Sequence, residues 1–414
     1  MIDFEKFELK NGLRFIVNTD RYTPFVVVNT LYNVGSKHEI PEKTGFAHLF
    51  EHLMFGGSKH IHSFDEPLQK VGGDNNAFTN TDITNYYTTV PKENIETAFW
   101  LESDRMLELA FSQKSLDIQK NVVIEEFKQR YLNRPYGDAW LHIRPLAYKM
   151  HPYKWATIGK HIEHIHTANL PDVKDFFFNH YAPNNAVISV SGNISAHKVK
   201  KLAQKWYSSI PARTLKENNN PTEPEQREYR SKTCVKDVPL HAIYKTYHMC
   251  ERLHPDFYVC DLLSDILSNG KSSRLYNKLV QKQKIFTDLQ AYITGEDDPG
   301  LFVITGNVMP GFTIEEANNA IDTELELLCS QSIEEYELQK VKNKVESTLI
   351  FSESSTLNKA MNLAKFELLG DADMINHEIE KYTRVSQNDI QRVAQDLFNK
   401  KNESTLLYKS QFQK

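Results

Sequence analysis

Apolar and polar residues alternate along the first part of the chain with the period of β-strands. The run FELKNGLRFIVN (residues 7–18) has apolar side chains at alternate positions on both sides of an Asn-Gly pair at residues 11–12. Such a pair between two alternating runs favours the tight turn of an antiparallel hairpin. The apolar runs at residues 24–34 and 186–192 predict further strands, and residues 76–90 supply strand-forming side chains around a short turn.

Helical periodicity marks three further segments of the first half. Apolar side chains recur at the spacing of one helix face over residues 93–109, 115–131 and 196–208. Ser115 has the hydroxyl side chain of an N-cap and is predicted to start the second of these helices. The mixture of strands and helices predicts an α+β fold.

A polar segment then separates two halves of the chain. Residues 211–232, PARTLKENNNPTEPEQREYRSK, contain three prolines and three consecutive asparagines and have the composition of a linker. The pattern restarts after it, with a strand predicted at residues 241–249 and a helix at 257–268. We predict α+β domains at residues 1–212 and 231–414, joined by a linker at 213–230, each a mainly antiparallel sheet with helices packed on one face.

The stretch GFAHLFEHLMFGG (residues 45–57) combines His48, Glu51 and His52 with mostly apolar neighbours. Residues i and i+4 lie on one face of a helix, so both imidazoles can coordinate one metal ion, and Glu51 would point into the same space. The order HxxEH is the inverted form of the zinc-peptidase motif HExxH. The alternative is an ordinary amphipathic helix, but burying these polar groups among apolar side chains is costly without a metal or hydrogen-bond partners.

The second half contains a degenerate copy of this stretch. The runs HLFEHLMFGG (residues 48–57) and DLLSDILSNG (residues 261–270) share their apolar spacing and terminal glycine. The tripeptides at residues 76–78 and 290–292 follow at nearly the same distance from that glycine. These matches predict an internal duplication, whereas two unrelated α/β domains are the alternative. The second copy lacks the motif, because Asp261, Ser264 and Asp265 replace His48, Glu51 and His52.

Composition and charge narrow the class of protein. A chain of 414 residues with 40% hydrophobic and 25% charged residues is typical of a globular protein with two or three domains. A net charge of −5 without a block of lysine and arginine argues against a nucleic-acid partner. The chain lacks a secretory signal pattern and any run near the roughly 20 apolar residues that cross a bilayer. We therefore expect no membrane partner and a cytoplasmic location, or a periplasmic one if a signal peptide has been removed.

A catalytic zinc ion usually has three protein ligands and one open position, so a third ligand must come from elsewhere in the fold. The helix predicted at residues 115–131 offers Glu125 and Glu126. Adjacent helical residues point about 100° apart, so at most one of them reaches the metal. The periodicity alone does not choose between them.

The motifs at residues 48–52, 74–91 and 121–130 (HLFEH, DNNAFTNTDITNYYTTVP and NVVIEEFKQR) together resemble the insulinase or pitrilysin family, which comprises inverted-motif zinc peptidases related to the mitochondrial processing peptidases. The resemblance is close in the first half and looser in the second. It implies that Glu126 is the third ligand and that the two domains close like a clamshell around peptides. The family has an acidic residue seven positions before this ligand, where the chain has Gln119, so one hydrogen bond around the ligands is in doubt.

The implied reaction is peptide hydrolysis. Zn²⁺ held by His48, His52 and Glu126 would lower the pKa of a water molecule and polarise the scissile carbonyl. Glu51, which is not a ligand, would take the proton of the water and pass it to the leaving amine.

The resemblance also implies a substrate-binding strand. Residues matching Asn76, Ala77 and Phe78 form an edge strand in the family, to which a peptide adds as a further strand. Pairing through the backbone does not depend on side chains, so this mode implies broad specificity. From the residues alone, a plain strand with Phe78 in the core is the alternative.

One departure from the family concerns the second half. Active single-chain members carry an arginine and, seven residues later, a tyrosine, which contact the substrate and stabilise the oxyanion. The run LVQKQKIFTDLQAY (residues 279–292) places Val280 and Thr287 at these positions. Some members pair a zinc-bearing subunit with a partner that supplies both residues. We therefore predict a homodimer, or a heterodimer with such a partner.

The sequence thus predicts a zinc-dependent endopeptidase that acts on peptides or unfolded segments. The alternative is a non-catalytic subunit that binds peptide strands or scaffolds a complex. The intact motif and Glu126 favour the enzyme, whereas Val280 and Thr287 favour the alternative.

Overall fold

The computed structural model describes residues 1–215 and 219–412, so residues 216–218 of the predicted linker lie outside the described residues. The chain forms two compact units, and each takes segments from both halves of the sequence. The first unit comprises residues 1–127, 155–220 and 350–377, and the second comprises residues 128–154, 221–349 and 378–414. The units therefore differ from the predicted domains, 1–212 and 231–414, by an exchange of segments.

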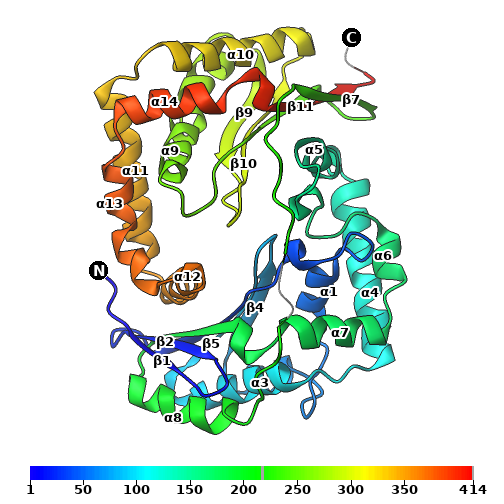
Figure 1. The fold of residues 1–414 in the computed structure, drawn as a ribbon, viewed down its shortest axis with the longest axis vertical. Coiled ribbons are helices and arrows are strands. Elements are labelled where there is room, and N and C mark those ends of the chain that lie inside the picture. The colour runs from blue at the N-terminus through cyan, green and yellow to red at the C-terminus, as the bar shows by residue number, and fades with distance from the viewer. Residues whose placement is uncertain (216–218, 413–414) are drawn as a thin grey trace. The chain divides into compact units, whose positions relative to one another are not determined.

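The first unit is built on a six-stranded sheet of order β1-β2-β6-β3-β5-β4 (Figure 1). The predicted hairpin is confirmed, because β1 and β2 pair antiparallel and Gly12 takes a φ of 81° in the turn. Only β2 and β6 run parallel. The strands are β1 (Glu5–Glu8), β2 (Arg14–Thr19), β3 (Phe25–Tyr32), β4 (Asp74–Thr79), β5 (Thr84–Pro91) and β6 (Ala186–Gly192).

Most helices of the first unit cover one face of this sheet. Phe15 of β2 stacks against Phe99 and packs edge-on against Tyr207, which belong to two of these helices. Three predicted helices are confirmed with small shifts of their ends. The helices are α1 (Phe46–Leu53), α2 (Asp65–Lys70), α3 (Ile95–Leu107), α4 (Gln113–Phe127), α6 (Ile162–His166), α7 (Leu170–His180) and α8 (Ala196–Tyr207).

The opposite face of the same sheet is covered by α12 (Thr356–Leu369), a helix from the second half of the sequence. Leu363 of α12 joins Ile16, Leu31 and Val187 of the strands in one buried apolar cluster. The prediction of helices on one face did not include this helix. The sheet needs it because Ile16 and Leu31 point away from the other helices and would otherwise be exposed to water.

The second unit repeats this arrangement in a five-stranded sheet of order β7-β11-β8-β10-β9, in which only β7 and β11 are parallel. The order is that of β2-β6-β3-β5-β4 when the strands are matched in sequence, which supports the predicted duplication. The strands are β7 (Arg230–Lys236), β8 (Ala242–His248), β9 (Phe286–Ile293), β10 (Leu301–Val308) and β11 (Glu403–Ser410).

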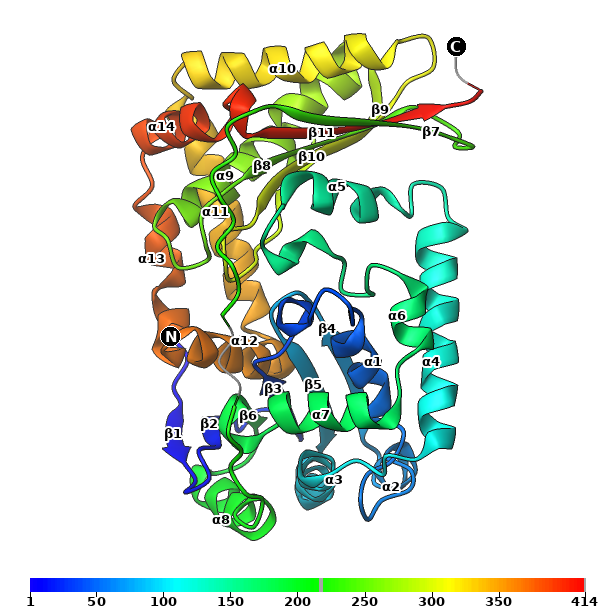
Figure 2. The same ribbon diagram turned by 45° about the vertical axis from the view of Figure 1, so that its right-hand side comes forward.

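Helices also cover both faces of the second sheet. One face carries the large apolar core, and Ile143 of α5, a helix from the first half, packs with Ala242 and Leu406 on the other. The first half of the chain thus supplies α5 to the second sheet, and the second half supplies α12 to the first sheet (Figure 2). The helices are α5 (Ala139–Ala147), α9 (Asp256–Ser268), α10 (Ile314–Ser330), α11 (Glu335–Ser352), α13 (Glu378–Thr383) and α14 (Gln387–Leu397).

The structure confirms the predicted fold class of two mixed, mainly antiparallel sheets with helices. The strand and helix predicted at residues 241–249 and 257–268 correspond to β8 and α9. Among the described residues, every helix is too short or too polar to span a membrane.

The exchanged helix gives a first prediction. Leu363→Ala removes a fully buried side chain from α12 and should destabilise the first unit by about 2–5 kcal/mol. Hydrogen exchange followed by mass spectrometry should show faster exchange in β2, β3 and β6 than in the wild type. Ile350→Ala is the matched control, because Ile350 is 53% exposed. Faster exchange confined to α12 would contradict the assignment of this helix to the first sheet.

Candidate metal centre

Helix α1 carries the HxxEH motif and is amphipathic. Its apolar residues, among them Leu49 and Phe50, are buried against the first unit. His48, Glu51 and His52 lie on the other side and are half-buried. The helical repeat therefore presents both imidazoles on one face, as the spacing predicts.

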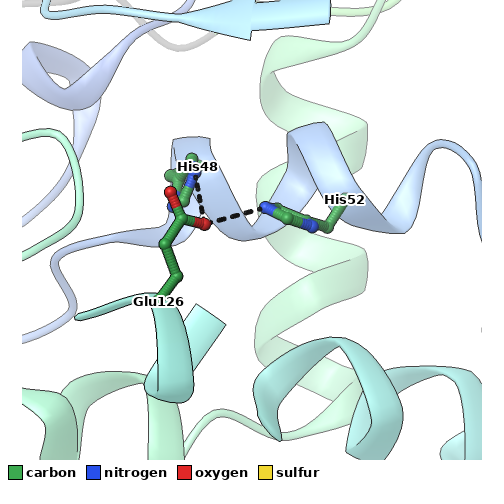
Figure 3. A group of neighbouring side chains, drawn as sticks. All are labelled: His48, His52 and Glu126. Carbon is green, nitrogen blue, oxygen red and sulfur yellow. Dashed lines mark ion pairs between the residues drawn. The ribbon is translucent and has the colours of Figure 1, made fainter. Parts of the chain in front are cut away.

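Glu126 of α4 lies opposite these imidazoles. Its Oε2 atom is 3.5 Å from Nε2 of His48 and 3.5 Å from Nε2 of His52 (Figure 3). The three candidate ligand atoms lie within 4.8 Å of one another, and no other group of this kind occurs within residues 1–215 and 219–412. Two atoms that bind one tetrahedral zinc ion at about 2.0–2.1 Å are themselves roughly 3.4 Å apart. The two separations from Glu126 therefore fit a single ion.

The structure distinguishes the two candidate glutamates of α4. Glu125 is exposed, whereas Glu126 is half-buried and turned toward the imidazoles.

Helix α4 runs beside α1 (Figure 2), and Ser115 Oγ donates to Gly56 O just beyond the end of α1. The prediction of Ser115 as N-cap is wrong, since α4 begins earlier and Ser112 Oγ accepts the N–H of Ser115. The hydroxyl of Ser115 instead ties α4 to the segment after α1.

Glu51 lies beside these three side chains without belonging to the ligand group. Burial raises the pKa of Glu51, and the nearby carboxylate of Glu126 raises it further. Thr79 and His52 lie close enough to act in the opposite direction. A carboxyl group held beside the candidate ligands without being one of them is placed for proton transfer.

Strand β4 lies at the edge of the six-stranded sheet and contacts α1. Phe78 is 39% exposed and Asn76 is exposed, while Ala77 is half-buried. The alternative of Phe78 in the core is therefore wrong, because the strand directs this residue to the face opposite α1. Strand β4 pairs with β5 along one side only, and the N–H of Ala77 donates to Asn76 Oδ1.

A buried ion pair behind α1 was not predicted from the sequence. Arg105 is 1% exposed and pairs with Glu102, which also accepts hydrogen bonds from Thr30 and Thr88. The guanidinium of Arg105 stacks on the ring of Tyr86, whose hydroxyl donates to the carbonyl of Phe50 in α1. Tyr86 therefore links this charged core to the motif helix.

Neither Val280 nor Thr287 supplies a cation or a phenol. Val280 packs against the core of the second unit in a π-helical turn, Tyr276–Lys282. Thr287 is exposed on β9 and donates to Asp288. Gln119 is half-buried on α4.

Comparison with known proteins identifies the family. The model of the insulinase peptidases, peptidase family M16, matches residues 14–146, and that of the peptidase M16 inactive domain matches residues 167–345. Zinc protease PqqE of Helicobacter pylori is 30% identical over 413 residues, which cover 98% of this chain and 92% of that protein. The chain belongs to the insulinase family of peptidases. Its similarity to relatives named zinc proteases extends over both units.

Further relatives and solved structures also match over nearly the whole chain. The probable mitochondrial-processing peptidase subunit beta of Schizosaccharomyces pombe is 23% identical and covers 94% of this chain and 87% of its own. A protease from Helicobacter pylori of known crystal structure superposes with a TM-score of 0.93 at 29% identity, covering 99% of this chain and all of that one. The peptidase M16 inactive domain from Pseudomonas fluorescens gives a TM-score of 0.90 at 16% identity, over 100% of this chain and 99% of that one, and shows the fold alone.

The ligand geometry can be tested by metal analysis. Loss of a hydrogen-bond partner around a metal weakens metal binding by roughly 10–100-fold. Glu126→Ala removes a ligand itself, so it should weaken zinc binding by more than this factor. Glu125→Ala is the matched control, since it removes the exposed neighbour from the same helix. Zinc content after dialysis should be one ion per chain in the control and the wild type. Equal zinc content in both variants would exclude Glu126 as a ligand.

Proposed function

We propose that the protein is a zinc-dependent endopeptidase that cleaves peptides or unfolded segments. The observation that carries this proposal is the convergence of His48, His52 and Glu126 from two helices, with Glu51 beside them. Two imidazoles and a carboxylate are the ligand set of a catalytic zinc site with one open position. Such donors also accept cobalt or manganese, and the names of the relatives favour zinc.

When bound, a zinc ion would act as a Lewis acid toward the scissile carbonyl and the attacking water. The chain's own residues have two roles, metal binding and proton transfer. His48, His52 and Glu126 hold the ion, and Glu51 accepts the proton that the attacking water loses. Glu51 then donates this proton to the leaving amine.

We further propose that peptides bind along β4. Because β4 is the edge strand, its free side can pair with the backbone of a peptide, which extends the sheet by one strand. Phe78 offers an exposed ring for a substrate side chain. Because most of these contacts involve the backbone, the enzyme should accept many sequences.

The active form is proposed to be a dimer. Val280 and Thr287 stand where active single-chain relatives are expected to have an arginine and a tyrosine, so a different subunit would supply these groups, and a homodimer is the other form of association. The same two residues support a second candidate function, a non-catalytic peptide-binding or scaffold subunit. Cleavage of a quenched peptide that a chelator abolishes and zinc restores supports the enzyme; zinc binding without cleavage, alone or with a partner, supports the subunit.

The role of Glu51 separates metal binding from turnover. Glu51→Gln keeps the size of the side chain but cannot accept a proton, so kcat should fall by about 10²–10⁴-fold while zinc content stays that of the wild type. Glu125→Gln controls for the loss of one carboxylate near the site. Unchanged turnover in Glu51→Gln would exclude Glu51 as the general base.

The missing phenol can be restored on β9. Thr287 is exposed, so Thr287→Tyr should be tolerated, and the proposed need for a phenol predicts a higher kcat of the isolated chain. Thr287→Phe adds the same ring without the hydroxyl and should give no increase. Equal kcat values for the two variants would contradict the proposed need for this group. Sedimentation of the wild type measures its association in parallel.

A further inference from the structure

Helix α1 begins without a capping side chain of its own. The first turn of a helix leaves backbone N–H groups without helical partners, and Ser, Thr, Asp or Asn at the N-cap usually binds them. The N-cap of α1 is Gly45, which has a φ of 87° and no side chain. A helix of eight residues is also too short to be stable in isolation, so its start must be held by other contacts.

The carboxylate of Glu39 takes over this role. Its Oε2 atom accepts the N–H of Gly45 at 2.9 Å, and its Oε1 atom accepts the N–H of Ala47 at 2.8 Å. Glu39 is 6% exposed, so both bonds are shielded from water. Burial raises the pKa of Glu39 to about 8, while the N–H groups of Ala47 and Gly45 act in the opposite direction.

The surroundings of Glu39 are themselves fixed. Trp155 is 2% exposed, contacts the Glu39 side chain, and donates its indole N–H to Ser36 O at 2.9 Å. A Cβ atom on Gly45 would come within 2.7 Å of Ile158 O, so the backbones are in close contact there. The carboxylate therefore has little room to move relative to the helix that it caps.

This cap adjoins the candidate ligands directly. Ala47, whose N–H binds Glu39, precedes His48, and His52 follows one turn later. A shift of the first turn would move both imidazoles relative to Glu126 on α4. Sites of this kind require ligands held within roughly 0.5 Å of the productive geometry.

We propose that Glu39 is a positioning residue of the metal centre, whose carboxylate fixes the first turn of α1 and thereby the placement of His48 and His52. This inference rests on the proposed zinc site. It assigns a function to a buried acid that is not a ligand and lies outside the HxxEH motif.

The variant Glu39→Gln tests the carboxylate without changing its volume. Both oxygens of Glu39 accept N–H groups, and glutamine must present an NH₂ group to one of these donors. The full-length variant should bind zinc about 10–100-fold more weakly, as when a hydrogen-bond partner around a metal is lost. The visible spectrum of the cobalt-substituted protein should change, and the amides of residues 45–49 should exchange faster in the metal-free protein.

Ser195→Ala is the matched control. Ser195 caps α8 in the same unit by accepting the N–H of Lys198, so its loss removes a helix cap away from the candidate ligands. This variant should unfold at a lower temperature than the wild type but keep its zinc affinity and cobalt spectrum. Equal losses of zinc affinity in Glu39→Gln and Ser195→Ala would show that any destabilisation of the first unit weakens zinc binding. This result would overturn the inference.

A wild-type zinc affinity and cobalt spectrum in folded Glu39→Gln would also overturn the proposal. If this variant does not fold, Glu39→Asp keeps the carboxyl group but shortens the side chain, and it should shift both readouts in the same direction by a smaller factor. Wild-type values in Glu39→Asp would then overturn the proposal. Failure of the proposed function can be distinguished from failure of this inference, because the wild type itself would then lack zinc-dependent cleavage.

Discussion

The packing of α1 against α4 is the constraint on which the candidate centre depends. The spacing of His48 and His52 aligns two imidazoles on one helix. A third donor must come from another element and lie opposite both imidazoles. The contact between the two helices places Glu126 Oε2 at 3.5 Å from both imidazole nitrogens. This separation is longer than an ordinary hydrogen bond and close to the spacing of two donors around one ion.

Several buried interactions keep α1 in place. Glu39 binds its first turn, Tyr86 donates to the carbonyl of Phe50 in its middle, and Ser115 of α4 donates to Gly56 just beyond its end. The bonds from Glu39 satisfy N–H groups of the first turn, which have no helical partners and are costly to leave unpaired in the interior. The helix is thus fixed along its length by side chains from three different segments.

The reciprocal exchange of α5 and α12 makes each compact unit depend on both halves of the chain. Each sheet has apolar residues on two faces, and the second face is covered by a helix from the other half. A duplication that simply repeated an independent domain would not require this exchange. Substitutions in the second half, such as those in α12, therefore affect the sheet that supports the candidate site.

The sequence predicts the features that depend on local spacing and leaves open those that depend on packing. The helix of the HxxEH motif and the hairpin at Gly12 follow from periodicity and turn chemistry. The choice between Glu125 and Glu126 needed either the family resemblance or the structure, because adjacent helical residues cannot be ranked without their neighbours. Glu39 was not predicted, because it lies six residues before the N-cap of the helix that it caps. No local capping pattern includes this distance.

The central claim is that one ion binds to His48, His52 and Glu126 while Glu51 stays free for proton transfer. Anomalous diffraction at the zinc edge, from crystals of the zinc-loaded protein, tests it most directly. The account predicts one peak at about 2.0–2.2 Å from Nε2 of each histidine and from the carboxylate of Glu126, with Glu51 beyond bonding distance. A peak elsewhere, or an ion bound by Glu51 in place of Glu126, would contradict it.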